Sequence, residues 1–109
     1  MVITTAPYHV VSLDETCRRQ QVGEGWFPSL ADVPTKALSM SIHQILQAAE
    51  ILVIVPDARK ANAVRATLTA DVGPDVPSTV LRRHPRATLF IDEPAASALD
   101  PALRMKYSV

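Results

Sequence analysis

Two short runs of apolar residues dominate the hydrophobic pattern of the chain, and both predict buried β-strands. Ile51–Val55 is apolar throughout, and Ala87–Ile91 is interrupted only by Thr88. Strands that are apolar on both faces are typical of a parallel sheet covered by helices on both sides. Weaker patterns predict a strand at Ala37–Ser41 and an edge strand at His9–Leu13.

Helical patterns fill most of the segments between these strands. The predicted helices cover residues 15–22, 42–49, 58–70, 77–83 and 94–99. Asp14 is a suitable cap for the first helix, and Pro77 suits the first position of the fourth. In the second helix, apolar residues recur at i, i+3, i+4 and i+7. Residues 1–8 are expected to form an arm, and the tail after Pro101 is weakly patterned.

The alternation of strands and helices predicts an α/β fold with parallel strands and right-handed βαβ connections. Two strong strands and one weaker strand are too few for a stable sheet, because their helices cannot cover both faces well. We therefore predict one partial domain over residues 1–109. It would be part of a doubly wound, three-layer α/β/α (Rossmann-like) domain with a short parallel sheet. Another chain, a swapped dimer or a missing N-terminal half would complete that sheet.

Composition and charge restrict the classes of function. The chain carries 11 basic and 11 acidic residues. Proteins that bind nucleic acids or membrane surfaces usually have a basic excess, so we expect neither partner. No apolar run reaches the ~18 residues of a membrane span, and the N-terminus does not resemble a signal peptide. Cys17 is the single cysteine and allows no intramolecular disulfide, so we expect a cytoplasmic location.

The turn after the first strong strand is the best candidate for chemistry. Parallel sheets place their binding sites at the carboxyl ends of strands, where the next helix begins. Lys60 lies at such a place, and an ammonium group beside helix N-terminal amides makes a phosphate site. The alternative is a solvated lysine on a helix face. Arg59 beside it is interpreted as a surface charge.

Other polar residues are interpreted as structural. Asp92 and Glu93 resemble an acidic active-site pair, but capping of the following helix explains them better. His84 precedes a proline at a helix end and is expected to make local contacts. The three histidines are scattered without metal-ligand spacing, so we predict no metal site.

The segment around the first predicted helix also has a structural interpretation. Trp26 and Phe27 are expected to anchor a core or an interface. Arg18 and Arg19 are most simply a solvated helix face. Cys17 is expected to be a buried or idle thiol, because no catalytic partner for it is identifiable.

Several segments match one enzyme family in order and in spacing. They are Val33–Ile42, Ile45–Leu52, Lys60–Val64, Val76–Pro85 and Leu89–Ala96. Together they span about residues 10–100 and resemble the glucosamine-6-phosphate deaminases. Arg19–Phe27 is more similar to the galactosamine-6-phosphate branch of this sugar-phosphate isomerase family.

The resemblance implies a substrate class and a reaction. Family members convert the 6-phosphate of a 2-amino-aldose to a ketose phosphate and release ammonia, without a metal or an organic cofactor. Lys60 falls at the phosphate lysine of the family. His43 stands where the family has a glycine, and Arg19 lies on a helix near the family's site. Both are therefore candidates for a ligand cleft.

The departures from the family are as informative as the matches. The family's Gly-rich phosphate loop, its aspartate base and its Asp-Gly-His ring-opening motif have no counterpart here. The family's phosphate-contacting arginine falls at Glu24 or Gly25. A lone ammonium group cannot replace the positioned acid and base of an isomerisation. We therefore expect the C-terminal portion of a deaminase-like protein that is inactive alone.

The alternative is a non-enzymatic domain that dimerises or binds a partner through its exposed sheet edge, because unpaired strand edges seek partners. We expect a homo-oligomer on this ground. A truncated reading frame is a further interpretation. The gluco or galacto configuration of the substrate, and deamination or simple isomerisation as the reaction, stay open.

Overall fold

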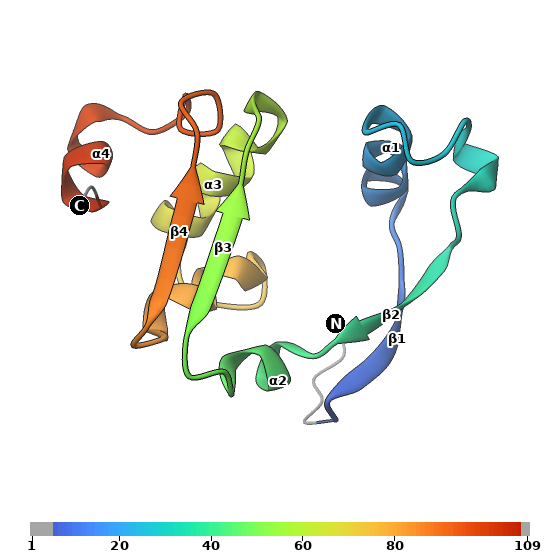
Figure 1. Cartoon of the computed structure of the whole chain (residues 1–109), viewed down its shortest axis with the longest axis horizontal. Coiled ribbons are helices and arrows are strands. Elements are labelled where there is room, and N and C mark those ends of the chain that lie inside the picture. The colour runs from blue at the N-terminus through green and yellow to red at the C-terminus, as the bar shows by residue number, and fades with distance from the viewer. Residues whose placement is uncertain (1–5, 108–109) are drawn as a thin grey trace. The chain divides into compact units, whose positions relative to one another are not determined.

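The computed structural model describes residues 6–107, which form two compact units (Figure 1). The N-terminal unit takes residues 6–47 and the C-terminal unit takes residues 48–107. Each unit contains a two-stranded sheet, which is antiparallel in the N-terminal unit and parallel in the C-terminal unit.

The sheet of the N-terminal unit joins β1 (Tyr8–Ser12) to β2 (Lys36–Met40), with Val10 opposite Leu38. The prediction that the β2 segment joins a parallel sheet is therefore wrong. Exposed and half-buried residues alternate along both strands, and Leu38 is 73% exposed. The exposed face of this pair carries apolar side chains such as Val10 and Leu38, so it is not the polar face that a solvated antiparallel sheet usually shows.

Side-chain caps define the helices of the N-terminal unit. In α1 (Glu15–Gly23), the Asp14 carboxylate accepts a hydrogen bond from the Cys17 amide at 2.6 Å, as predicted. A 3₁₀ turn follows at Leu30–Asp32. In α2 (Ile42–Leu46), the Ser41 hydroxyl accepts from Gln44 at 3.1 Å. This helix is shorter than predicted, because its isoleucines stay largely exposed and little packing supports a longer one.

Trp26 does not anchor a core, so that alternative of the prediction is wrong, whereas a role in an interface stays a prediction. Its side chain is 71% exposed, and its indole nitrogen donates to the Glu24 carboxylate at 3.3 Å. The residue follows Gly25, whose φ of 84° turns the chain away at the end of α1. Phe27 is half-buried.

The C-terminal unit contains the predicted parallel sheet. Its strands β3 (Ile51–Val55) and β4 (Ala87–Ile91) pair residue by residue, from Ile51 with Ala87 to Val55 with Ile91. Between them come α3 (Ala61–Thr69), which lies behind the strands in Figure 1, and a 3₁₀ segment at Pro77–Arg83. This strand–helix–strand unit confirms the predicted α/β class with a short parallel sheet.

One face of the parallel sheet is buried and the other is not. Val64 of α3 packs with Ala95, Ala96 and Leu99, and sheet residues such as Leu89 join this cluster. On the opposite face three large apolar side chains are 52–74% exposed: Leu52, Ile54 and Phe90. The prediction of strands buried on both faces is therefore wrong for this chain, because helices cover only one side of the sheet.

The last residues also differ from the prediction. Residues 93–98 form turns instead of a helix, and the helix α4 (Pro101–Tyr107) occupies the weakly patterned tail. Burial of Ala95 and Leu99 against the core fixes the turns. The Asp100 carboxylate then accepts from the Leu103 amide at 2.9 Å and caps α4. Within residues 6–107, no helix is long and apolar enough to cross a membrane.

Candidate functional site

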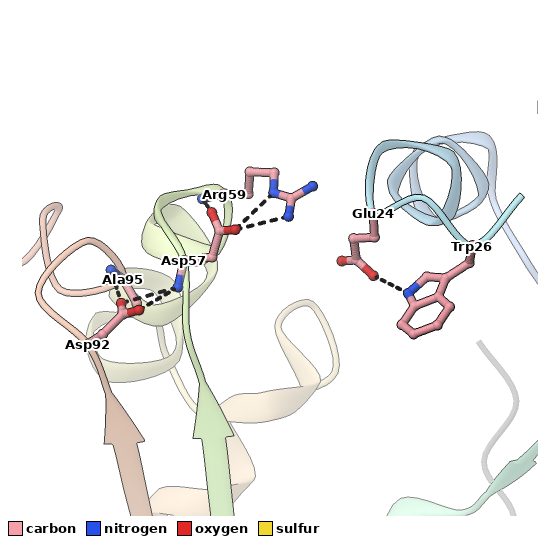
Figure 2. A network of polar contacts seen from close by, with 6 residues as sticks. All are labelled: Glu24, Trp26, Asp57, Arg59, Asp92 and Ala95. Atoms are coloured by element: carbon pink, nitrogen blue, oxygen red, sulfur yellow. Dashed lines mark hydrogen bonds and ion pairs between the residues drawn. The ribbon is translucent and has the colours of Figure 1, made fainter. Parts of the chain in front are cut away.

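The carboxyl ends of the two parallel strands meet at one edge of the sheet. Because Val55 pairs with Ile91, the turns after β3 and β4 begin side by side. The backbone amide of Asp57 donates to both carboxylate oxygens of Asp92, at 3.1 Å each. Asp92 also accepts from the Ala95 amide at 2.8 Å, so one carboxylate links the two turns (Figure 2).

Asp57 has an unusual backbone conformation. Its φ is 89° and its ψ is 141°, a region that residues other than glycine rarely adopt. Such a conformation costs on the order of 1–3 kcal/mol and persists only where surrounding contacts hold it. The bonds from the Asp57 amide to Asp92 are contacts of this kind.

The Asp57 side chain is held by the residue two positions along the chain. Its carboxylate accepts from the Arg59 amide at 2.9 Å and from the Arg59 guanidinium at 2.9 and 3.3 Å (Figure 2). These hydrogen bonds, with smaller contributions from the charges of Arg59 and Lys60, hold the pKa of Asp57 below its ordinary value of 3.8. Asp57 is therefore a fixed anion at neutral pH.

Lys60 lies at the junction between this turn and α3. It ends the 3₁₀ turn Ala58–Lys60, stands directly before the first residue of α3, and is half-buried. Its amide donates to the Asp57 carbonyl oxygen at 3.1 Å. The structure thus puts Lys60 after a parallel strand and at the start of a helical segment, as the sequence predicted. Its role in binding phosphate stays a prediction.

The other two predicted site residues belong to the N-terminal unit. Arg19 is exposed on α1 and pairs with Glu15 at 2.7 Å, one helical turn away. His43 is exposed on α2. The structure therefore groups neither residue with Lys60 in one unit, and their contact with a ligand stays a prediction.

Arg18 has a structural role that the sequence did not reveal. Its guanidinium donates to the carbonyl oxygens of Leu30 at 2.9 Å and Val33 at 3.0 Å, and it is half-buried. The prediction of a solvated helix face is wrong for Arg18, because its side chain ties α1 to the segment before β2. Its position beside the exposed Arg19 gave no signal of this difference.

The prediction that Asp92 and Glu93 cap a helix starting at Pro94 is wrong, because residues 93–98 form turns instead of a helix. Both residues nevertheless have structural roles: Asp92 accepts from the Ala95 amide in the turn that follows β4, and Glu93 pairs with Arg104 at 2.9 Å.

His84 makes the predicted local contact, because one ring nitrogen accepts from the Arg86 amide at 3.0 Å. Its other ring nitrogen lies 2.8 Å from the carbonyl oxygen of Ala48, a residue distant in the sequence.

Asp57 is the residue that sequence reasoning missed. The Pro-Asp dipeptide after an apolar strand indicates a sharp turn, but no local pattern indicates a φ of 89°. Across residues 6–107 no three histidine, cysteine, aspartate or glutamate side chains cluster as they would around a metal ion.

Several curated proteins of similar sequence are named glucosamine-6-phosphate deaminase, although no family model matches the chain. Glucosamine-6-phosphate deaminase of Exiguobacterium sibiricum is 39% identical over 94 residues, which are 86% of this chain and 36% of that protein. Glucosamine-6-phosphate deaminase 1 of Bacillus subtilis is 42% identical over 89 residues, or 82% of this chain and 36% of that protein.

A solved structure gives the same result for the fold. It is described as a monomeric glucosamine-6-phosphate deaminase, with a TM-score of 0.79 and 39% identity over 85% of this chain and 38% of that one. The chain thus spans little more than a third of the length of the relatives it matches. Sequence and fold together show that the chain is similar to the C-terminal part of glucosamine-6-phosphate deaminases.

Proposed function

We propose that this chain supplies the phosphate-binding lysine of a deaminase-like protein of amino-sugar phosphate metabolism. The observation that carries the proposal is the position of Lys60 at the carboxyl end of β3 and the start of a helical segment. Ligands of α/β sheets bind at this end of the strands, and an ammonium group attracts a phosphoryl group there. The names of the relatives support an amino-hexose 6-phosphate as the ligand.

The same residues do not make a complete catalyst. Proton transfer between C1 and C2 of a sugar needs a general base within hydrogen-bond reach, and the motifs that serve this purpose in the family have no counterpart in the sequence. Lys60 binds and orients the phosphate. The chain works in the cytoplasm and needs no cofactor.

Calorimetric titration with glucosamine 6-phosphate tests the role of Lys60. We expect saturable binding that Lys60→Ala abolishes or weakens at least tenfold. Arg65→Ala is the matched control, because it removes one positive charge from the exposed side of the same helix. Unchanged affinity in Lys60→Ala would contradict the assignment of Lys60 as the phosphate-binding residue.

An assay of ammonia release tests the absence of catalysis. We expect the purified chain to release no ammonia from glucosamine 6-phosphate above the buffer rate, because the base and the ring-opening group are missing. Turnover that scales with the concentration of the chain would contradict this part of the proposal.

A second candidate function is self-association as a non-enzymatic dimerisation domain. Leu52, Ile54 and Phe90 leave one face of the parallel sheet apolar and exposed, and such patches mark contact sites. The solved relative is described as monomeric, so a homodimer would be a property of this shorter chain. It would cover the sheet face that helices leave open.

Sedimentation velocity tests the second candidate. We expect a dimer for the wild-type chain and a monomer for Ile54→Asp. Met105→Asp is the matched control, because Met105 is 83% exposed on α4 rather than on the sheet. A monomeric wild-type chain at high concentration would rule out this function.

A further inference from the structure

The turn that carries Lys60 also carries a negatively charged side chain, the carboxylate of Asp57. The Asp57 carboxylate already accepts three hydrogen bonds from Arg59, and the charge of Lys60 also acts on it. A phosphoryl group at Lys60 would therefore enter next to a negative charge. We propose that Asp57 is a specificity-determining residue that opposes the binding of a phosphoryl dianion at Lys60; the inference rests on the proposed function of Lys60.

Asp57 is not free to turn away from an incoming ligand. Its backbone is held by the two bonds from its amide to Asp92, and its carbonyl oxygen accepts from the Lys60 amide. Its carboxylate is held by both the amide and the guanidinium of Arg59. Movement of the carboxylate would break its bonds to Arg59, so the charge stays in the turn that carries Lys60.

The effect has the size of a short-range electrostatic interaction at a partly exposed site. Asp57 and Arg59 expose 44% and 52% of their side chains, so water and salt screen their charges. Repulsion between one carboxylate and a dianion a few ångströms away still changes affinity by about tenfold in such surroundings. The structure thus assigns to Asp57 a weak, salt-dependent effect that lowers the affinity of the turn for dianions.

Calorimetry with glucosamine 6-phosphate at low ionic strength tests the inference. Asp57→Asn removes the charge and keeps an oxygen that can accept from the Arg59 amide. Asp71→Asn is the matched control, because it changes the net charge equally at the far end of α3. We expect Asp57→Asn to bind about tenfold more tightly than the wild-type chain, and Asp71→Asn to bind as the wild-type chain does.

Two further titrations distinguish the effect of Asp57 from the proposed phosphate binding by Lys60, on which the inference rests. Glucosamine without phosphate should show no gain in Asp57→Asn, because the effect acts on the phosphoryl group. Adding Lys60→Ala to Asp57→Asn should abolish the gain, and a gain that survives would remove Lys60 from the site.

Equal affinity of Asp57→Asn and the wild-type chain would overturn the inference. The proposed function would still stand in that case if Lys60→Ala alone weakened binding. The absence of binding in every variant would overturn both, because removal of the opposing charge should expose any phosphate site at Lys60.

Discussion

Asp57 accepts hydrogen bonds from the amide and the guanidinium of Arg59, and protonation of its carboxyl group would weaken both. The residue also adopts a φ of 89°, which its own type does not favour. At the scale of single residues, the turn before α3 therefore depends on two carboxylates. The Asp57 carboxylate accepts from Arg59, two residues along the chain. The Asp92 carboxylate, directly after β4, accepts from the backbone amide of Asp57.

The lowered pKa of Asp57 predicts a pH-dependent contribution to stability. The folded-state pKa lies below the ordinary value of 3.8, so the folded chain binds the proton less tightly than the unfolded chain. The stabilisation is therefore fully present above the unfolded pKa and is lost as the pH falls through the folded pKa. Urea denaturation should show that the stability difference between the wild-type chain and Asp57→Asn shrinks on acidification from pH 7. A difference that does not change with pH would contradict this account.

Substitution of Asp92 should destabilise the C-terminal unit. Asp92→Ala leaves the Asp57 and Ala95 amides without their acceptor, which should cost about 1–2 kcal/mol in the free energy of unfolding. Glu93→Gln is the control and should cost less than about 1 kcal/mol, because its ion pair with Arg104 is largely exposed. Equal losses of unfolding free energy in the two variants would show that the hydrogen bonds that Asp92 accepts from the two turns add nothing to the stability of the unit.

At the scale of elements, the C-terminal unit is a sheet with two unlike faces. Val64 of α3 is 3% exposed beneath one face, whereas Ile54 of β3 is 74% exposed on the other. Apolar residues occur on both faces of β3, but α3 and the turns after β4 cover only one of them. The composition of a strand therefore does not by itself determine its burial.

The unequal burial of Val64 and Ile54 predicts that truncation of each to alanine affects the free energy of unfolding differently. Val64→Ala should destabilise the chain by about 1–3 kcal/mol, because it leaves a cavity among packed residues. Ile54→Ala should change the stability of the monomer by about 0.5 kcal/mol or less. Thermal unfolding at low protein concentration measures both, and a larger loss for Ile54→Ala would mean that its face is covered in solution.

The elements with strong local signals were predictable from the sequence. The bounds of β3 and β4 follow from short apolar runs, of which the second is interrupted only by Thr88, and α1 follows from the Asp14 cap. The partner of β2 was not predictable, because its antiparallel pairing with β1 depends on contacts far apart in the sequence. The position of Lys60 was predictable because it follows from the local order of strand, turn and helix. The positive φ of Asp57 and the hydrogen bonds of Arg18 to the segment before β2 were not predictable, because no local sequence pattern indicates them.

At the scale of the whole molecule, the uncovered sheet face and the comparison with relatives agree. The chain matches about 36% of the length of the deaminases, and a two-stranded parallel sheet needs cover on both faces. A second copy or a chain with the remaining part of the fold would provide that cover. The contribution that we propose for this chain is a phosphate-binding lysine, Lys60.

A nitrogen–proton correlation NMR spectrum of the chain, recorded during titration with glucosamine 6-phosphate, tests this contribution most directly. The account predicts saturable shift changes that cluster at residues 57–61 and disappear in Lys60→Ala. Changes that cluster elsewhere, or that persist in Lys60→Ala, would contradict the assignment of Lys60 as the phosphate-binding residue.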